Sequence, residues 1–130
     1  MTTATATDTY FRNQVESATP LQRVVMLYDG AISFLEDSGR QMRQRDYEAA
    51  PLLNIRAQNI LMELQGSLNM KEGGELSARL HSLYAYFLRR LIAANSKRDP
   101  AILDEVIGQL REMRGSWAEL AAGKNSGEVN

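Results

Sequence analysis

The stretch LHSLYAYFLRRLIAAN, residues 80–95, decides the fold class. At about 100° per residue, a helix gathers most of its apolar residues into one broad stripe. That stripe contains Leu80, Leu83, Tyr84, Phe87, Leu91 and Ala94. Further apolar residues widen it on one side (Leu88, Ile92) or lie beyond its other edge (Tyr86, Ala93). A surface helix of a small protein needs an apolar face only a little wider than 100°. Neighbouring helices or a partner must therefore cover this segment on several sides.

Helical spacing of apolar residues recurs on both sides of this stretch. The sequence therefore predicts four helices, over about 20–44, 46–70, 75–96 and 100–121. Thr19-Pro20-Leu21-Gln22 is typical of a capping box with proline at the first helical position. Asp46 and Asp99-Pro100 are typical of two further helix starts, and Gly73-Gly74 marks a break. Pro51 falls in the first turn of its helix, where a missing N–H costs least.

The four apolar stripes predict the core. On the flanking helices they contain Leu21, Val24, Val25, Tyr28, Ala31, Ile32, Leu35, Met42, Leu53, Ala57, Ile60, Leu61, Leu64, Leu68, Leu103, Val106, Leu110, Met113, Trp117 and Leu120. Trp117 is expected to be the largest single apolar contributor. Because the connections are short, neighbouring helices should be antiparallel.

The fold class is therefore predicted to be all-α, as an antiparallel up-down four-helix bundle. The bundle domain is expected over residues 18–121. Residues 1–17 are interpreted as a mobile or capping N-terminal segment, and residues 122–130 as a flexible tail.

Composition excludes several classes of function. The chain has 130 residues, a formal net charge of −1 and no cysteine. It thus has no overall basic field to attract nucleic acid or an anionic membrane, and no disulfide or thiolate metal site. No apolar run approaches the length of a membrane span, and MTTATATDTY at the N-terminus is unlike a secretion signal. We expect a cytoplasmic protein without membrane insertion.

The sequence lacks the combinations of residues that catalysis or metal binding would need. A di-iron bundle needs inward Glu-x-x-His pairs, but the only histidine is His81 and position 78 is alanine. A serine nucleophile needs a base, and the lysines are few and terminal. The sequence predicts no enzyme, no metal and no cofactor.

Surplus apolar surface is the informative feature. Pairs seven residues apart lie outside or at the edge of the core stripes, as for Ile55 and Met62. The others are Leu27 with Phe34 and Tyr86 with Ala93, while Leu88 and Ile92 lie on the far flank of their stripe. Rows of this kind are typical of surfaces that take a partner. The pattern alone leaves open a peptide-binding module, self-association, or wide stripes that simply pack within the bundle.

Several segments in order resemble the flagellin export chaperones of the FliS family. They are ATPLQRVVMLYDGAISFLEDS at 18–38, AQNILMELQGSLNMKEGGELSARLHSLYAYFLRRLIAANSKRD at 57–99, and ILDEVIGQLREMRGSW at 102–117. The resemblance covers about residues 10–120. It departs at Pro51, which falls where the family pattern is helical, and offers no match in the tail.

This resemblance implies a cytoplasmic chaperone that binds the disordered C-terminal segment of newly made flagellin. Such a chaperone prevents early polymerisation and helps deliver its client to the flagellar type III export apparatus. The implied partner-binding residues are Ile55, Met62, Tyr86, Leu88, Ile92 and Ala93, with Leu27 and Phe34 as weaker candidates. Asn95 and Arg89 either satisfy polar groups of the partner or pair within the bundle.

The N-terminal segment also resembles the family, in which this region can fold over the client surface. Tyr10, Phe11 and Val15 are the apolar groups for such a cap; a frayed terminus is the other interpretation. The rival function is a self-assembling helical module that uses the same surplus surface. The chaperone interpretation implies a monomer or a weak homodimer.

Overall fold

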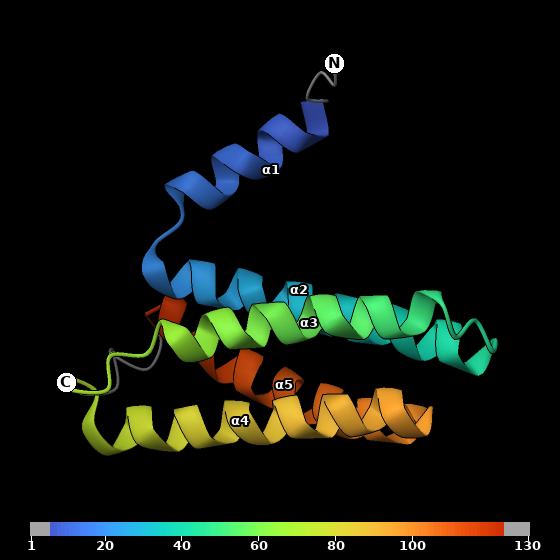
Figure 1. Cartoon of the computed structure of the whole chain (residues 1–130). Coiled ribbons are helices and arrows are strands. Elements are labelled where there is room, and N and C mark those ends of the chain that lie inside the picture. The colour runs from blue at the N-terminus through green and yellow to red at the C-terminus, as the bar shows by residue number, and fades with distance from the viewer. Residues whose placement is uncertain (1–5, 124–130) are drawn as a thin grey trace.

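The computed structural model describes residues 6–123 and is all-helical in that range (Figure 1). Its five helices are α1 (Ala6–Ser17), α2 (Pro20–Arg43), α3 (Ala49–Gly66), α4 (Gly74–Lys97) and α5 (Pro100–Ala121). The bounds of α2, α4 and α5 agree with the predicted helices to within one residue, whereas α3 begins later and ends earlier than the predicted range 46–70. The predicted helical bundle is confirmed.

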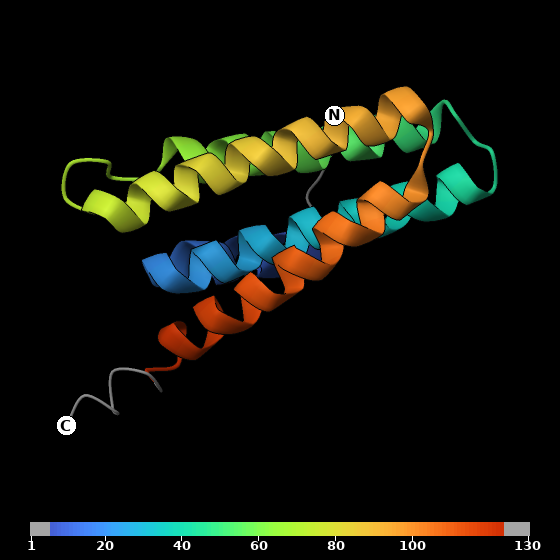
Figure 2. The ribbon, with the colours of Figure 1, turned by 90° about the horizontal axis from the view of Figure 1, so that it is seen from below.

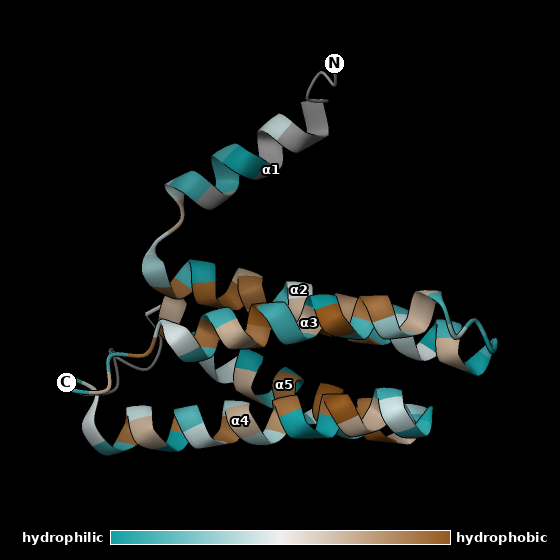
Figure 3. Cartoon of the chain, in the orientation of Figure 1, coloured by the Kyte–Doolittle hydropathy of each residue, from teal (hydrophilic) through white to brown (hydrophobic). Residues whose placement is uncertain are grey.

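The four long helices pack in a ring, α2 against α3 and α5, and α4 against α3 and α5. Successive helices run in opposite directions, as Figures 1 and 2 show. Apolar residues gather on these four helices, whereas the described residues of α1 are largely hydrophilic (Figure 3). α2 and α4 therefore lie diagonally opposite each other.

Local capping chemistry explains the helix starts. Thr19 Oγ1 accepts from the backbone N–H of Gln22, and Gln22 Oε1 accepts from that of Thr19, which completes the predicted capping box. Asp99 Oδ1 accepts from the N–H of Ala101 at the start of α5. Asp46 Oδ1 accepts from the N–H of Ala49 just before α3.

The end of α3 differs from the prediction. The helix was expected to reach about residue 70, but it ends at Gly66. Ser67 Oγ donates to the carbonyl of Leu64, and Asn69 Oδ1 accepts from the N–H of Glu72. These side chains offer the backbone an alternative to helical hydrogen bonds, so the chain turns early toward α4.

The core sits where the four stripes meet, but its largest buried side chains are Tyr28, Tyr84 and Phe87. The expectation for Trp117 is corrected. Its indole is only partly buried, with its ring 6.5 Å from that of Tyr28, because it lies near the end of α5 where fewer helices surround it. Leu120 was expected in the core but is 39% exposed, since α5 diverges from α4 toward its C-terminal end (Figure 2).

One pair of buried hydroxyls crosses the core. Tyr28 and Tyr84 lie 2.7 Å apart between their oxygens, and both side chains are inaccessible to solvent. Burial raises the pKa of both phenols above the usual value near 10. The two hydroxyls satisfy each other, which allows polar groups at the centre of an apolar core.

This pair predicts alkaline instability. Because the folded pKa values lie above those of the unfolded chain, stability is unaffected below about pH 10 and falls above it, by about 1.4 kcal/mol per pH unit for each tyrosine. The double variant Tyr28→Phe/Tyr84→Phe should be nearly neutral at pH 7, because both partners are removed together, and should flatten the decline. Urea unfolding at several alkaline pH values measures both effects. An unchanged decline in the double variant would contradict the assignment.

The N-terminal segment is helical over α1, which the sequence did not predict. Figure 1 shows α1 leaving the bundle at the N-terminal end of α2. The side chains of Tyr10, Phe11 and Val15 lie outside the described part of the chain. Their role as a cap stays a prediction, as does the division into segments 1–17, 18–121 and 122–130.

Candidate partner-binding surface

Three predicted site residues are exposed on adjacent helices. Ile55 and Met62 on α3 are 44% and 49% exposed, and Ile92 on α4 is 58% exposed. Leu88, one turn before Ile92, is partly buried against the core. We call the surface formed by Ile55, Met62, Leu88 and Ile92 the α3–α4 face. Exposed large aliphatic side chains on neighbouring helices are typical of a surface that binds an apolar partner.

A polar network joins α3 to α4 beneath this face. Asn54 is fully buried, and its Nδ2 donates to the carbonyl of Leu91 at 2.9 Å and to Oδ1 of Asn95 at 2.9 Å. Its Oδ1 accepts from Gln58 Nε2 at 2.9 Å. Asn95 Nδ2 in turn reaches the carbonyl of Pro51 at 3.4 Å. Asn95 therefore pairs within the bundle, the second of the two roles considered for it.

A second amide bridges the same seam two turns away. Gln65 Nε2 donates to the carbonyl of His81 at 3.0 Å. Gln58 and Gln65 are seven residues apart, so they lie on the same side of α3. Both glutamines lie between the exposed apolar residues of α3 (Ile55, Met62) and those of α4 (Leu88, Ile92). The α3–α4 face is thus a broad apolar surface, and the amides at its centre already form hydrogen bonds within the bundle.

Asn54, which holds α3 and α4 together beneath this face, was not identified from the sequence. It lies within the core stripe of its helix, where the pattern suggested nothing more than an interruption. A buried amide must find partners, and a polar residue at a core position is the one available signal of a cross-helix network.

Tyr86 does not join the α3–α4 face. Its hydroxyl donates to Glu105 on α5 at 2.9 Å, and Arg90 Nη2 donates to the same carboxylate at 2.9 Å. The Arg90 hydrogen bond, with that of Tyr86, lowers the pKa of Glu105 below its usual range. The sequence predicted that Tyr86 and Ala93 lie beyond the edge of the α4 stripe opposite to Leu88 and Ile92, and the contact of Tyr86 with α5 agrees with that placement. Ala93, seven residues after Tyr86, follows it to the opposite edge of α4.

Leu27 and Phe34 lie on α2, and both pack partly buried against the core. The guanidinium of Arg56 on α3 sits 5.7 Å from the centre of the Phe34 ring. This cation–π contact covers the ring from the α3 side. These residues belong to the α2–α3 seam, on the other side of α3 from the α3–α4 face.

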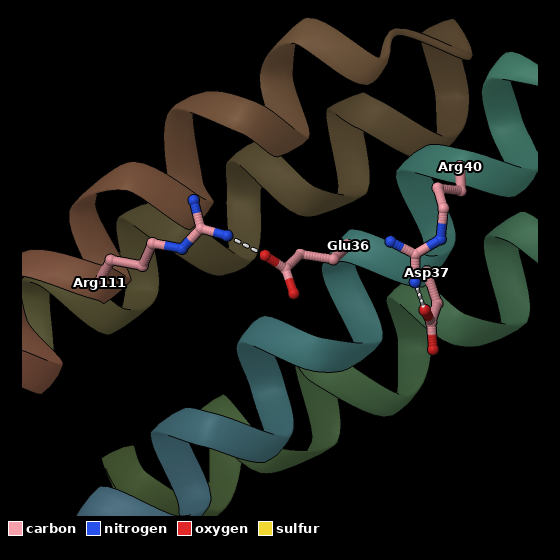
Figure 4. Close-up of polar contacts among 4 residues, drawn as sticks. All are labelled: Glu36, Asp37, Arg40 and Arg111. Atoms are coloured by element: carbon pink, nitrogen blue, oxygen red, sulfur yellow. Dashed lines mark hydrogen bonds and ion pairs between the residues drawn. The ribbon is translucent and has the colours of Figure 1, made fainter.

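The α2–α5 seam is charged. Arg43 pairs with Asp104 at 2.7 Å, and Arg114 pairs with Asp29 at 2.8 Å. Figure 4 shows Arg111 of α5 reaching Glu36 of α2, with Arg40 paired to Asp37 on α2 itself. Exposed pairs of this kind contribute little to stability. They make this seam a solvated one, in contrast with the α3–α4 face.

The described residues contain no cluster of three acidic, histidine or cysteine side chains able to hold a metal ion. His81 is exposed, and its carbonyl rather than its ring makes the recorded contact. None of the helices in the described range is long and apolar enough to cross a membrane.

Comparison with known proteins decides the family. The family model described as flagellar protein FliS matches residues 2–124, nearly the whole chain. The chain belongs to the FliS family. The flagellar secretion chaperone FliS of Bacillus subtilis is 37% identical over 110 residues, covering 85% of this chain and 81% of that protein. The flagellar secretion chaperone FliS of Salmonella typhimurium is 34% identical over 126 residues, covering 93% of each.

A third FliS relative, the flagellar secretion chaperone of Vibrio cholerae, is 32% identical over 108 residues, covering 83% of this chain and 79% of that protein. The FliS family is one of secretion chaperones and not of enzymes. The resemblance noted in the sequence is confirmed, and so is the prediction that the chain is not an enzyme.

Proposed function

We propose that this FliS-family chain is a cytoplasmic flagellar secretion chaperone whose client is the C-terminal segment of newly made flagellin. The observation that carries the proposal is the α3–α4 face. Ile55, Met62 and Ile92 are exposed there, above a seam whose amides are engaged with one another. An amphipathic helix is the natural partner for such a surface, since it brings apolar anchors at helical spacing.

Docking on this face couples folding to binding. A client segment that is disordered when free loses conformational entropy as it forms helix on the preformed template. The chaperone itself changes little, because its core and polar network are already in place. No nucleotide or metal takes part. While docked, the client cannot polymerise, and it remains available to the flagellar export apparatus.

The remaining predicted residues have secondary roles in this proposal. Leu27 and Phe34, in the α2–α3 seam, extend the path of a client that wraps around the bundle. Tyr86 and Ala93 extend it on the far side of α4. Tyr10, Phe11 and Val15 form a cap that occupies part of the client surface until flagellin displaces it. The chaperone works as a monomer or a weak homodimer.

Calorimetric titration with a peptide from the C-terminal region of the organism's own flagellin tests the proposal. We expect saturable one-to-one binding, a negative heat-capacity change, and helix gained on mixing by circular dichroism. Absence of binding by the folded protein would contradict the client assignment. If sedimentation then showed dimers that dissociate on replacing Ile55 or Ile92 by serine, the self-assembling module would be the better interpretation.

A further inference from the structure

The seam between α4 and α5 is closed at one end and open at the other. At the closed end, Glu105 of α5 binds Arg90 and Tyr86 of α4. Toward the C-terminal end of α5 the two helices diverge, as Figure 2 shows from below and Figure 1 from the side. A hollow of about 240 Å³ lies where they separate, lined by Leu83, Phe87, Gln109, Glu112 and Met113.

The register of the two helices brings unlike residues together along this seam. In an antiparallel pair, seven residues forward on one helix correspond to seven back on the other. α5 carries a glutamate at every seventh position: Glu105, Glu112 and Glu119. The matching positions on α4 are Arg90, Leu83 and Leu76. Only the first glutamate thus has a basic residue at the matching position of α4; the positions that match the other two are leucines.

Apolar side chains line the open part of the seam without being covered. Leu76 on α4 is 64% exposed and Leu120 on α5 is 39% exposed, although the register brings their positions within one residue of each other. Met113 is partly buried beside them. Leu83 also lines a neighbouring hollow of about 610 Å³ on α4. We call the surface formed by Leu76, Leu83, Met113, Leu120, Glu112 and Glu119 the α4–α5 cleft.

The charge of the cleft is one-sided. Among the described residues, Glu112 and Glu119 form no ion pair. Arg79, the basic side chain on the α4 side, is paired with Glu75 one turn away. An occupant that buries the leucines would also remove water from both glutamate carboxylates. That desolvation costs free energy unless the occupant brings positive charges to pair with them. The leucines and the two glutamates of the cleft therefore favour an amphipathic segment that has basic residues beside its apolar face.

The helix α1 of this chain does not fit that description. α1 carries Arg12 against Asp8 and Glu16, a formal charge of −1. A second copy docking symmetrically through the same cleft would bring Glu112 and Glu119 against their own counterparts, and like charges disfavour that arrangement. A separate protein remains as the occupant.

We propose that the α4–α5 cleft docks an amphipathic helix of a second partner protein, whose apolar residues lie against Leu76, Leu83 and Leu120 and whose Lys or Arg residues pair with Glu112 and Glu119. The cleft lies on the side of α4 away from the α3–α4 face. A client helix on the α3–α4 face and the second partner in the cleft therefore occupy different sides of α4.

Two synthetic peptides of about 18 residues, or five helical turns, test the proposal with the full-length protein. One has a leucine face flanked by lysines; its isomer has glutamates in place of the lysines. We expect the lysine peptide to bind saturably, with methyl chemical shifts moving at Leu76, Leu83, Met113 and Leu120. The glutamate isomer should bind at least about tenfold more weakly. Raising the salt concentration should reduce this difference.

Paired variants assign the site. Leu76→Ser/Leu120→Ser should weaken the lysine peptide about tenfold or more. Glu112→Gln/Glu119→Gln should weaken it and reduce its salt dependence. The matched controls are Ile55→Ser/Ile92→Ser, which alters the α3–α4 face, and Glu48→Gln/Glu63→Gln, which makes the same change in net charge just before α3 and on it. Both controls should bind the lysine peptide as the unmodified protein does.

Several results would overturn the proposal. They are equal binding of the two peptides, or cleft variants that bind the lysine peptide like the controls. Dimerisation of the free protein that the cleft variants abolish would assign the cleft to a second copy instead. Because client binding is measured with flagellin peptide and α3–α4 variants, failure of the second-partner proposal is distinguishable from failure of the client proposal.

Discussion

The variant Ile92→Asp is expected to abolish binding of the flagellin C-terminal segment while the bundle stays folded. Ile92 is 58% exposed, so the change should cost less than about 1 kcal/mol of folding stability. In the complex, the same aspartate would be buried without a partner. We expect affinity to fall by at least about a hundredfold, measured by calorimetric titration.

The adjacent residue is the matched control. Leu91 is fully buried against the other helices, and Leu91→Asp places the same carboxylate in the core. That variant should lose more than about 4 kcal/mol and unfold at room temperature, as followed by circular dichroism. If Ile92→Asp were as unstable as Leu91→Asp, Ile92 would be a core residue and the α3–α4 face would be wrongly assigned.

The second large effect is expected at Asn54. Asn54→Asp keeps the shape of the side chain but replaces its donor by a carboxylate oxygen facing two acceptors, the Leu91 carbonyl and Asn95 Oδ1. The buried, repelled charge should cost about 3–5 kcal/mol at pH 7. Asn59→Asp is the same substitution on the exposed side of α3 and should change stability by less than about 0.5 kcal/mol.

The pH dependence separates this mechanism from a simple packing defect. Burial should raise the pKa of the new aspartate above the value near 3.9 of the unfolded chain, because its charged form is disfavoured. Its penalty is then smallest below about pH 4 and grows as pH rises through the folded pKa. Urea unfolding of both variants between about pH 3 and pH 7 measures this. A penalty that does not change with pH would mean that charge plays no part.

The helices could be predicted well because their signals are local. Thr19, Gln22 and Asp99 bond to backbone groups within three residues, so the sequence contains both partners of each contact. The end of α3 could not be predicted. The hydrogen bonds of Ser67 and Asn69 to the backbone compete with helical hydrogen bonds, and the difference in free energy is too small for helix propensity to reveal. α1 was missed because it lacks the apolar periodicity that marked the others.

The candidate site was predicted in part. Excess apolar residues outside the stripes correctly indicated that Ile55, Met62 and Ile92 are exposed, because helical spacing alone determines which residues cannot face the core. The same spacing placed Tyr86 beyond the other edge of its stripe, away from Ile92, but it did not identify the residue that Tyr86 contacts. The partner of Tyr86 is Glu105, nineteen residues away on another helix, and no pattern within α4 contains that information.

The sequence by itself thus determined the number of long helices, their caps, the apolar faces and the family. These properties follow from residues within one or two helical turns of each other. Only the tertiary structure decided that Asn54 joins α3 to α4, that Trp117 and Leu120 lie outside the core centre, and that α5 diverges from α4. Those properties depend on how helices cross and separate. That geometry is set by the packing of side chains distant in sequence, whose contacts exist only in the assembled bundle.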